Sequence, residues 1–172
     1  MIEAVLKDSK SETLDAIFEK SITDYKSYTR GSLQYHKQYA KRMTLKGKIN
    51  SALLRDYSNK RQVVNHFFDS DRPIPIWAIF ESLTLGEFGT FFSCASSNIK
   101  LATSSILKLP RNLDADGKIT EYIIYTIKDL RNAVAHNNTI FDTRFQTNSV
   151  NRRLLSLLEA EIGTDGLDFK YI

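Results

Sequence analysis

Arg131 and His136 lie five positions apart at the end of a helical pattern, in the segment RNAVAH. Histidine titrates near neutral pH and suits proton transfer. Arginine keeps its charge and presents a planar fork that matches phosphate oxygens. Asn132, four residues before His136, shares its face of a helix and could orient the imidazole or a phosphate. These three residues are the first candidates for a site that acts on a phosphate ester.

A helical wheel over residues 119–136 predicts the surroundings of these residues, at about 100° per residue. The apolar stripe that should face the core holds Ile119, Ile123, Ile127, Leu130 and Val134. Nearly opposite lie Tyr125, Asp129, Asn132 and His136, with Arg131 between the two faces. The wheel leaves one alternative open, in which His136 only complements the carbonyls at the helix end.

Helices are predicted for almost the whole chain, because glycine (7) and proline (3) are scarce and strand-like alternation is missing. Asp, Ser and two prolines in DSDRPIP (69–75) form the clearest boundary. Gly86 and Gly89 are expected to bend a helix or to let another helix approach closely, and Gly163 to stop the last helix. The predicted segments are 11–20, 47–68, 76–92, 96–108, 119–136 and 148–162. The expected fold is all-α, a bundle of five to six helices in one domain over residues 1–172.

The surroundings of RNAVAHN resemble a known family. A Pro-x-Trp segment runs into E-x-L-x-x-G, and L-R-N-x-x-A-H follows about 40 residues later; the matching residues are Pro75, Trp77, Glu81, Leu83, Gly86, Leu130, Arg131, Asn132, Ala135 and His136. This pair of motifs is similar to that of the Abi-like (abortive infection, Abi_2-type) family of the HEPN ribonuclease superfamily, which carries an R-x4-6-H motif. The resemblance is best over 73–145 and vaguer over 25–72. Residues 1–24, read as an N-terminal helix or arm, show no close match.

The resemblance implies a HEPN-like helical bundle that acts as a metal-independent endoribonuclease on single-stranded RNA, in phage defence or as a toxin. Arg131, Asn132 and His136 would be catalytic. One chain supplies one such histidine on this helix, so an acid and a base need a second copy, as in a homodimer. The alternatives are a non-catalytic HEPN-like module that binds RNA or protein, and a helical dimerisation protein with a coincidental motif. No cofactor is expected, and an antitoxin or a regulatory RNA stays open as a further partner.

Residues beside the motif are expected to support it. Glu81, inside an apolar segment, is expected either to pair with a cation such as Arg131 and position it, or to lie at the surface. Asp129 is the second candidate for a supporting carboxylate. Trp77 and Phe80 are interpreted as core anchors. The DADG segment at 114–117 lacks the other ligands of a calcium loop and is interpreted as a turn.

The charge of the chain is concentrated in one stretch. The net charge is +4, yet residues 37–61 alone hold eight basic residues and one acidic residue, which gives +7. Clustered basic residues are typical of contact with a polyanion, and a solvated helix face is the alternative. The candidates for gripping RNA are Lys41, Arg42, Lys46, Lys48, Lys60 and Arg61.

Other classes of protein are disfavoured by composition. Cys94 is the single cysteine, so an internal disulfide and a CxxC zinc site are excluded. No HxxxH, HExxH or carboxylate cluster suggests a catalytic metal. No apolar run reaches the roughly 18 residues of a membrane span, and the polar N-terminus is unlike a secretory signal. The sequence therefore predicts a cytoplasmic protein without a membrane partner.

Overall fold

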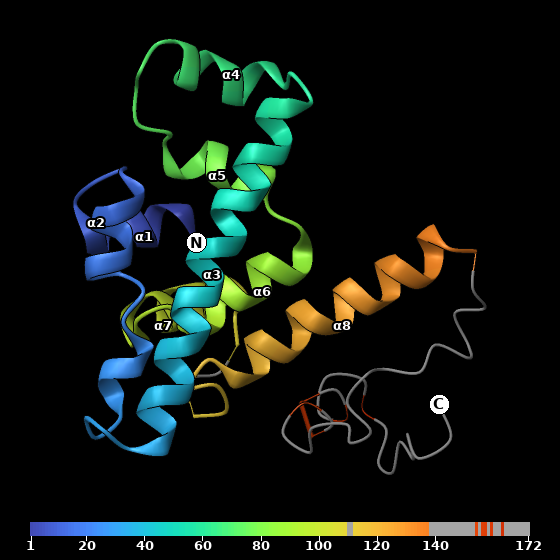
Figure 1. Ribbon diagram of the computed structural model, residues 1–172. Helices are drawn as coiled ribbons and strands as arrows, with labels where there is room; N and C mark the ends of the chain where they lie inside the picture. The colour runs from blue at the N-terminus through green and yellow to red at the C-terminus, as the bar shows by residue number, and fades with distance from the viewer. Residues whose placement is uncertain (110–111, 138–153, 155, 158, 160–162, 164–172) are drawn as a thin grey trace.

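The computed structural model describes residues 1–109 and 112–137, together with residues 154, 156, 157, 159 and 163 (Figure 1). The all-α class is confirmed: the described residues form eight α-helices and one 3-10 helix, and no strand. In chain order these are α1 (Ile2–Ser9), α2 (Leu14–Lys20), the 3-10 helix η1 (Asp24–Ser27), α3 (Leu33–Ser58), α4 (Gln62–Asp69), α5 (Ile76–Ser82), α6 (Leu85–Cys94), α7 (Ser97–Ile106) and α8 (Lys118–Ala135). Most of the predicted helix 148–162 lies outside the described residues.

The long helix α3 is the central element, and it packs against η1, α4, α5 and α6. Ser32 caps it, because its side chain accepts a hydrogen bond from the backbone N–H of Tyr35 at 3.1 Å. The prediction of one helix over 47–68 was wrong. The chain breaks after Ser58, where Lys60 takes a left-handed φ of 57° and α4 begins at Gln62. Neither glycine nor proline marks this break, so the helical pattern runs across it.

The apolar segment 76–92 forms two helices, and neither Gly86 nor Gly89 causes the break. Thr84 is the N-cap of α6, and a capping box with Glu87 starts the new helix there. Its hydroxyl accepts from the N–H of Glu87 at 3.3 Å, while the Glu87 carboxylate accepts from the N–H of Thr84 at 2.8 Å. The sequence T-L-G-E is the expected pattern for this cap.

The core lies between α3 and the short helices around it. α1 packs against α2 and α7, while α5 and α6 pack against α3. The buried cluster at the centre holds Val5, Ile17, Phe18, Ile22, Leu45, Ile49, Leu53, Val64, Ile76, Ile79, Phe91, Cys94, Ala95 and Ile99. Almost all of α8 lies outside this cluster, so the helix with the candidate motif is packed onto the bundle from one side.

The contact between α6 and α8 depends on Gly89, which confirms the expected close approach. A Cβ atom at this position would lie 3.0 Å from Cζ of Tyr125 and 3.3 Å from Cγ2 of Ile124. Distances this short leave no room for a methyl group without a shift of the Tyr125 ring. Because Gly89 has no side chain, α8 can lie close to α6 at this position.

Replacing Gly89 with alanine should lower the free energy of unfolding by about 1–3 kcal/mol, because the added methyl group overpacks the α6–α8 contact. Gly47 is the matched control: it lies within α3, and its Cβ would meet nothing within 4 Å. Gly47→Ala should raise stability by roughly 0.5–1 kcal/mol through helix propensity. Urea unfolding of both variants checks the pair, and equal effects of the two substitutions would contradict the packing described.

Candidate functional site

Asp114 anchors the start of α8. Its segment was interpreted from the sequence as a turn, and the carboxylate within that turn is fully buried. It accepts hydrogen bonds from the backbone N–H groups of Ile119 (2.7 Å) and Thr120 (3.2 Å), and from the hydroxyls of Thr120 (2.6 Å) and Ser104 (2.7 Å). The two N–H groups are among those that a helix N-terminus leaves unpaired, where negative charge is also favourable. Because Ser104 belongs to α7, the carboxylate ties the two helices together.

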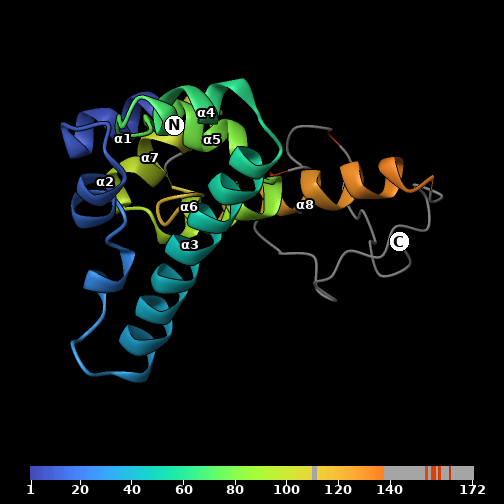
Figure 2. The same ribbon diagram turned by 45° about the horizontal axis from the view of Figure 1, so that its top comes forward.

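The far half of α8 extends away from the bundle. In both views its C-terminal end lies clear of the other described helices (Figures 1 and 2). The predicted core stripe is wrong in this half, since Ile127 is 51% exposed and Val134 is 59% exposed. The buried residues of α8 include Ile124, which lies beside Gly89, and Ala133. The wheel located an apolar face correctly, but it cannot tell whether the rest of the same chain covers that face.

The three motif residues lie at this projecting end. Arg131 is exposed, and its guanidinium donates to the side-chain oxygen of Asn132 at 3.2 Å. His136 is exposed at the C-cap, where its backbone N–H donates to the carbonyl of Asn132 at 3.0 Å. The structure thus brings Arg131 and Asn132 into contact, and it links His136 to Asn132 through the backbone. His136 is exposed, and its side chain makes no hydrogen bond or ion pair within the described part of the chain.

The two carboxylates expected to support the motif have other neighbours. Asp129 forms an ion pair with Lys128 on the same helix, at 2.8 Å. Glu81 is exposed on α5, and its electrostatic neighbour is Arg61, at the N-cap of α4, rather than Arg131. Neither carboxylate contacts Arg131 or His136 among the residues described.

Four of the six basic residues predicted to bind RNA form ion pairs or hydrogen bonds with other residues of the chain. Lys41 pairs with Glu121 at 3.6 Å, and Lys46 pairs with Asp15 at 2.7 Å. Arg42 donates to the carbonyls of Ile22 (3.1 Å) and Phe18 (2.9 Å), and Arg61 donates to Asp56 at 2.8 Å. Lys48 and Lys60 are exposed, and their side chains make no hydrogen bond or ion pair with a described residue. RNA binding by these six residues stays a prediction.

The distance along α8 separates the basic stretch from the motif. The Lys41–Glu121 ion pair joins α3 to the first turn of α8. His136 follows Glu121 by 15 residues, or about 22 Å at the helical rise. An RNA strand would need several nucleotides to reach from Lys41 to His136.

The ion pair between Asp56 and Arg61 shifts the pKa values of both residues. Burial raises the pKa of this carboxyl, but hydrogen bonds from Arg61 and then Arg55 outweigh burial and hold the pKa below its usual value. The hydrogen bond with Asp56 raises the pKa of Arg61, to which the charges of Asp56 and Glu81 add. Arg55 also donates to the carbonyl of Ser82 at 2.7 Å, so this cluster joins α3 to the end of α5.

Asp56→Asn should lower the free energy of unfolding at neutral pH by about 1–3 kcal/mol, because a buried acceptor loses its charge beside two arginines. Since the folded-state pKa lies below the unfolded value near 3.8, the stabilisation is complete above about pH 4 and lost as the pH falls through the folded-state pKa. The stability gap between wild type and variant should therefore close in acid.

Chemical unfolding between pH 7 and pH 2 measures this gap. Asp15→Asn is the control, because the side chain of Asp15 is 87% exposed and its loss should cost under about 0.5 kcal/mol. A gap for Asp56→Asn that is constant across this pH range would contradict the described electrostatics.

Three further side chains differ in how accessible they are to solvent. Trp77 is 47% exposed, so its interpretation as a core anchor was wrong, whereas Phe80 packs against the rings of Phe88 and Phe91. Cys94 is buried, and that burial raises the pKa of its thiol. The thiol therefore stays protonated at neutral pH and is a poor candidate for a nucleophile.

The described residues contain neither a metal-binding cluster nor a membrane-spanning helix. No group of three or more His, Cys, Asp or Glu is arranged there to hold a metal ion. None of the described helices is both long and apolar enough to cross a lipid bilayer.

Comparison with known proteins gives one match. A family model described as Abi-like protein matches residues 1–142, which include all of α1 to α8 and the motif. No curated protein and no solved structure matches the chain significantly.

Proposed function

Because the chain belongs to the Abi-like protein family, we propose that it is a metal-independent endoribonuclease of the HEPN type. The family assignment supports a role in abortive infection, a bacterial defence against phage. The proposed substrate is single-stranded RNA, and the proposed site combines Arg131, Asn132 and His136 from two copies of the chain. The alternative is a non-catalytic module that binds RNA or protein with the same surface.

The observation that carries the proposal is the exposure of the motif beside two exposed apolar side chains of the same helix. Arg131 follows Ile127 by four residues and precedes Val134 by three, so all three are neighbours on the helix surface. Ile127 and Val134 are more than half exposed. Full burial of an exposed side chain of this kind is favourable by about 1.5–3 kcal/mol, and roughly half of that remains to be gained at each position. A second copy packed on this face would draw the Arg131 side chains of both copies into one region.

The chemistry explains why one copy is insufficient. One histidine takes the proton of the 2′-hydroxyl, whose oxygen attacks the phosphorus and forms a cyclic phosphate. A second, protonated histidine gives a proton to the departing 5′-oxygen, and arginine stabilises the charge on the phosphoryl oxygens. The chain has three histidines, and the other two, His36 and His66, lie on α3 and α4. Two copies of His136 would supply both the acid and the base.

Cleavage of single-stranded RNA in the presence of EDTA tests the catalytic assignment. His136→Ala and Arg131→Ala should each lower the rate by roughly 100-fold or more, as expected for loss of an acid–base group or a charge-stabilising group. His36→Ala is the control, because His36 is exposed on α3, and its rate should stay within twofold of wild type. RNA that wild type binds but leaves intact would favour the non-catalytic module. Equal cleavage by all four proteins would contradict the assignment.

Substitution of the apolar face tests the second copy. Ile127→Asp should convert a dimer to a monomer and abolish cleavage while the helical content in circular dichroism stays that of wild type, because Ile127 is exposed in one copy. Ile106→Asp is the control, since Ile106 is 65% exposed at the end of α7. Light scattering and RNA cleavage should leave the control unchanged. A dimer that survives Ile127→Asp, or a wild-type monomer that cleaves RNA, would rule out this interface.

A further inference from the structure

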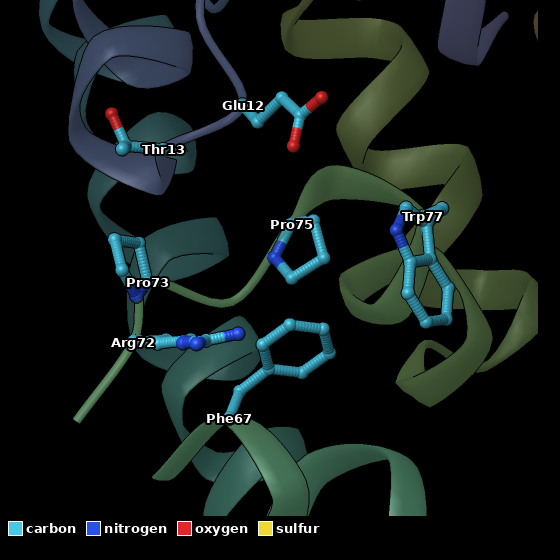
Figure 3. Close-up of a pocket in the computed structure, with 7 residues that line it drawn as sticks. All are labelled: Glu12, Thr13, Phe67, Arg72, Pro73, Pro75 and Trp77. Carbon is cyan, nitrogen blue, oxygen red and sulfur yellow. The ribbon is translucent and has the colours of Figure 1, made fainter. Parts of the chain in front are cut away.

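A pocket lies on a different part of the fold from the motif. It opens between the turn that joins α1 to α2 and the loop that joins α4 to α5, with a volume of about 410 Å³ (Figure 3). Its walls are Glu12, Thr13, Phe67, Arg72, Pro73, Pro75 and Trp77. Pockets of roughly 300–1,000 Å³ are typical of small-molecule sites.

One wall of the pocket is aromatic. Phe67 and Trp77 meet edge to face, with ring centroids 5.8 Å apart and an angle of 70° between the planes. Trp77 is 47% exposed, although an indole of this size is usually mostly covered. Pro75 lies between the two rings and Glu12 in the close-up. The exposed indole gives a flat ligand a surface on which to stack.

Two opposite charges flank this apolar surface. The guanidinium of Arg72 points along the pocket towards Phe67, and the carboxylate of Glu12 lies on the other side of Pro75 (Figure 3). Both residues are exposed, and neither side chain forms a hydrogen bond or an ion pair with any described residue. A cation and an anion that are both unpaired can each bind a complementary group of one ligand.

The backbone holds these side chains in place. The N–H of Arg72 donates to the carbonyl of Phe67 at 2.9 Å, after Asp71 has turned the chain with a φ of 52°. On the opposite wall, the hydroxyls of Ser11 and Thr13, which flank Glu12, lie 3.1 Å apart in a hydrogen bond. The proline rings restrict the loop further. The backbone around the pocket therefore needs little further ordering by a ligand, which favours binding, and the side chains of Arg72 and Glu12 are the groups that a ligand would order.

We propose that this pocket binds one unpaired nucleotide. The base stacks on Trp77 and contacts Phe67, and Arg72 binds the phosphate through its planar fork. Glu12 accepts a hydrogen bond from an amino group of the base or from a ribose hydroxyl. A proline-rich peptide would fit the aromatic and proline surfaces but would bring no anion for Arg72. The nucleotide can be free or part of an RNA strand, and the proposal is independent of catalysis at His136.

Trp77 allows a direct test, because it is the only tryptophan in the chain. Its fluorescence is followed while the full chain is titrated with each of the four nucleoside monophosphates and their nucleosides. A single-stranded 2′-O-methyl oligonucleotide, which cannot be cleaved through its 2′ position, completes the series. The monophosphates or the oligonucleotide should change the emission saturably. Saturation by monophosphates identifies a free nucleotide as sufficient, and saturation by the oligonucleotide alone identifies a nucleotide within a strand.

Variants assign the binding to the pocket. Arg72→Gln should weaken binding of the phosphate-bearing ligand at least tenfold. Glu12→Gln should weaken binding of the bases that carry an amino group if Glu12 contacts the base, or of all four nucleotides alike if it contacts the ribose. Arg30→Gln, at an exposed arginine just before α3, should bind within twofold of wild type. These side chains are exposed, so the variants should fold, which circular dichroism verifies.

Three results would overturn the proposal. The first is emission of Trp77 that does not change with any nucleotide or with the oligonucleotide up to millimolar concentration. The second is binding by Arg72→Gln that equals that of wild type. The third is saturation by a proline-rich peptide while every nucleotide fails. RNA cleavage plays no part in this readout, so a failure here is distinguishable from a failure of the ribonuclease proposal.

Discussion

The carboxylate of Asp114 is the contact on which the placement of α8 depends. It is buried, and it pairs with two N–H groups at the helix start and with hydroxyls of Ser104 and Thr120. Gly117, with a φ of 71°, starts the helix directly after the turn, and Gly89 lets α6 approach its middle. The first half of α8 is thereby fixed in direction, and the second half extends from the bundle along that direction.

The direction of α8 places the motif residues at the surface of the chain. Among the described residues, α8 packs on α6 and α7 through its first half, so its far end is exposed and Arg131 and His136 lie at the surface. Interactions between charges are weak where water has access, so an exposed site stabilises the charge of a transition state only weakly. A second copy packed on Ile127 and Val134 would exclude water and supply the second histidine. Stability of the assembly and completion of the site would then come from the same apolar face.

Sequence patterns predicted the parts of this structure that depend on local chemistry. The all-α class, the boundary at residues 69–75 and a helix close to α8 follow from apolar spacing and from proline. The break between α5 and α6 was equally readable, since Thr84 and Glu87 have capping-box spacing. The exposure of Val134 and Trp77 was not readable, because it depends on which distant helices are near. Likewise, Asp114 resembled an ordinary turn residue until Ser104 and Thr120 were found around it.

The central claim is a catalytic site completed by a second copy of the chain. Its most direct test is the initial rate of single-stranded RNA cleavage, in EDTA, over a protein dilution series in which mass photometry reports the dimer fraction. The rate per chain should fall in proportion to the dimer fraction, and the monomer should be inactive. A rate per chain that stays constant while the dimer dissociates would contradict the composite site, and absence of cleavage by the fully dimeric protein would contradict the ribonuclease itself.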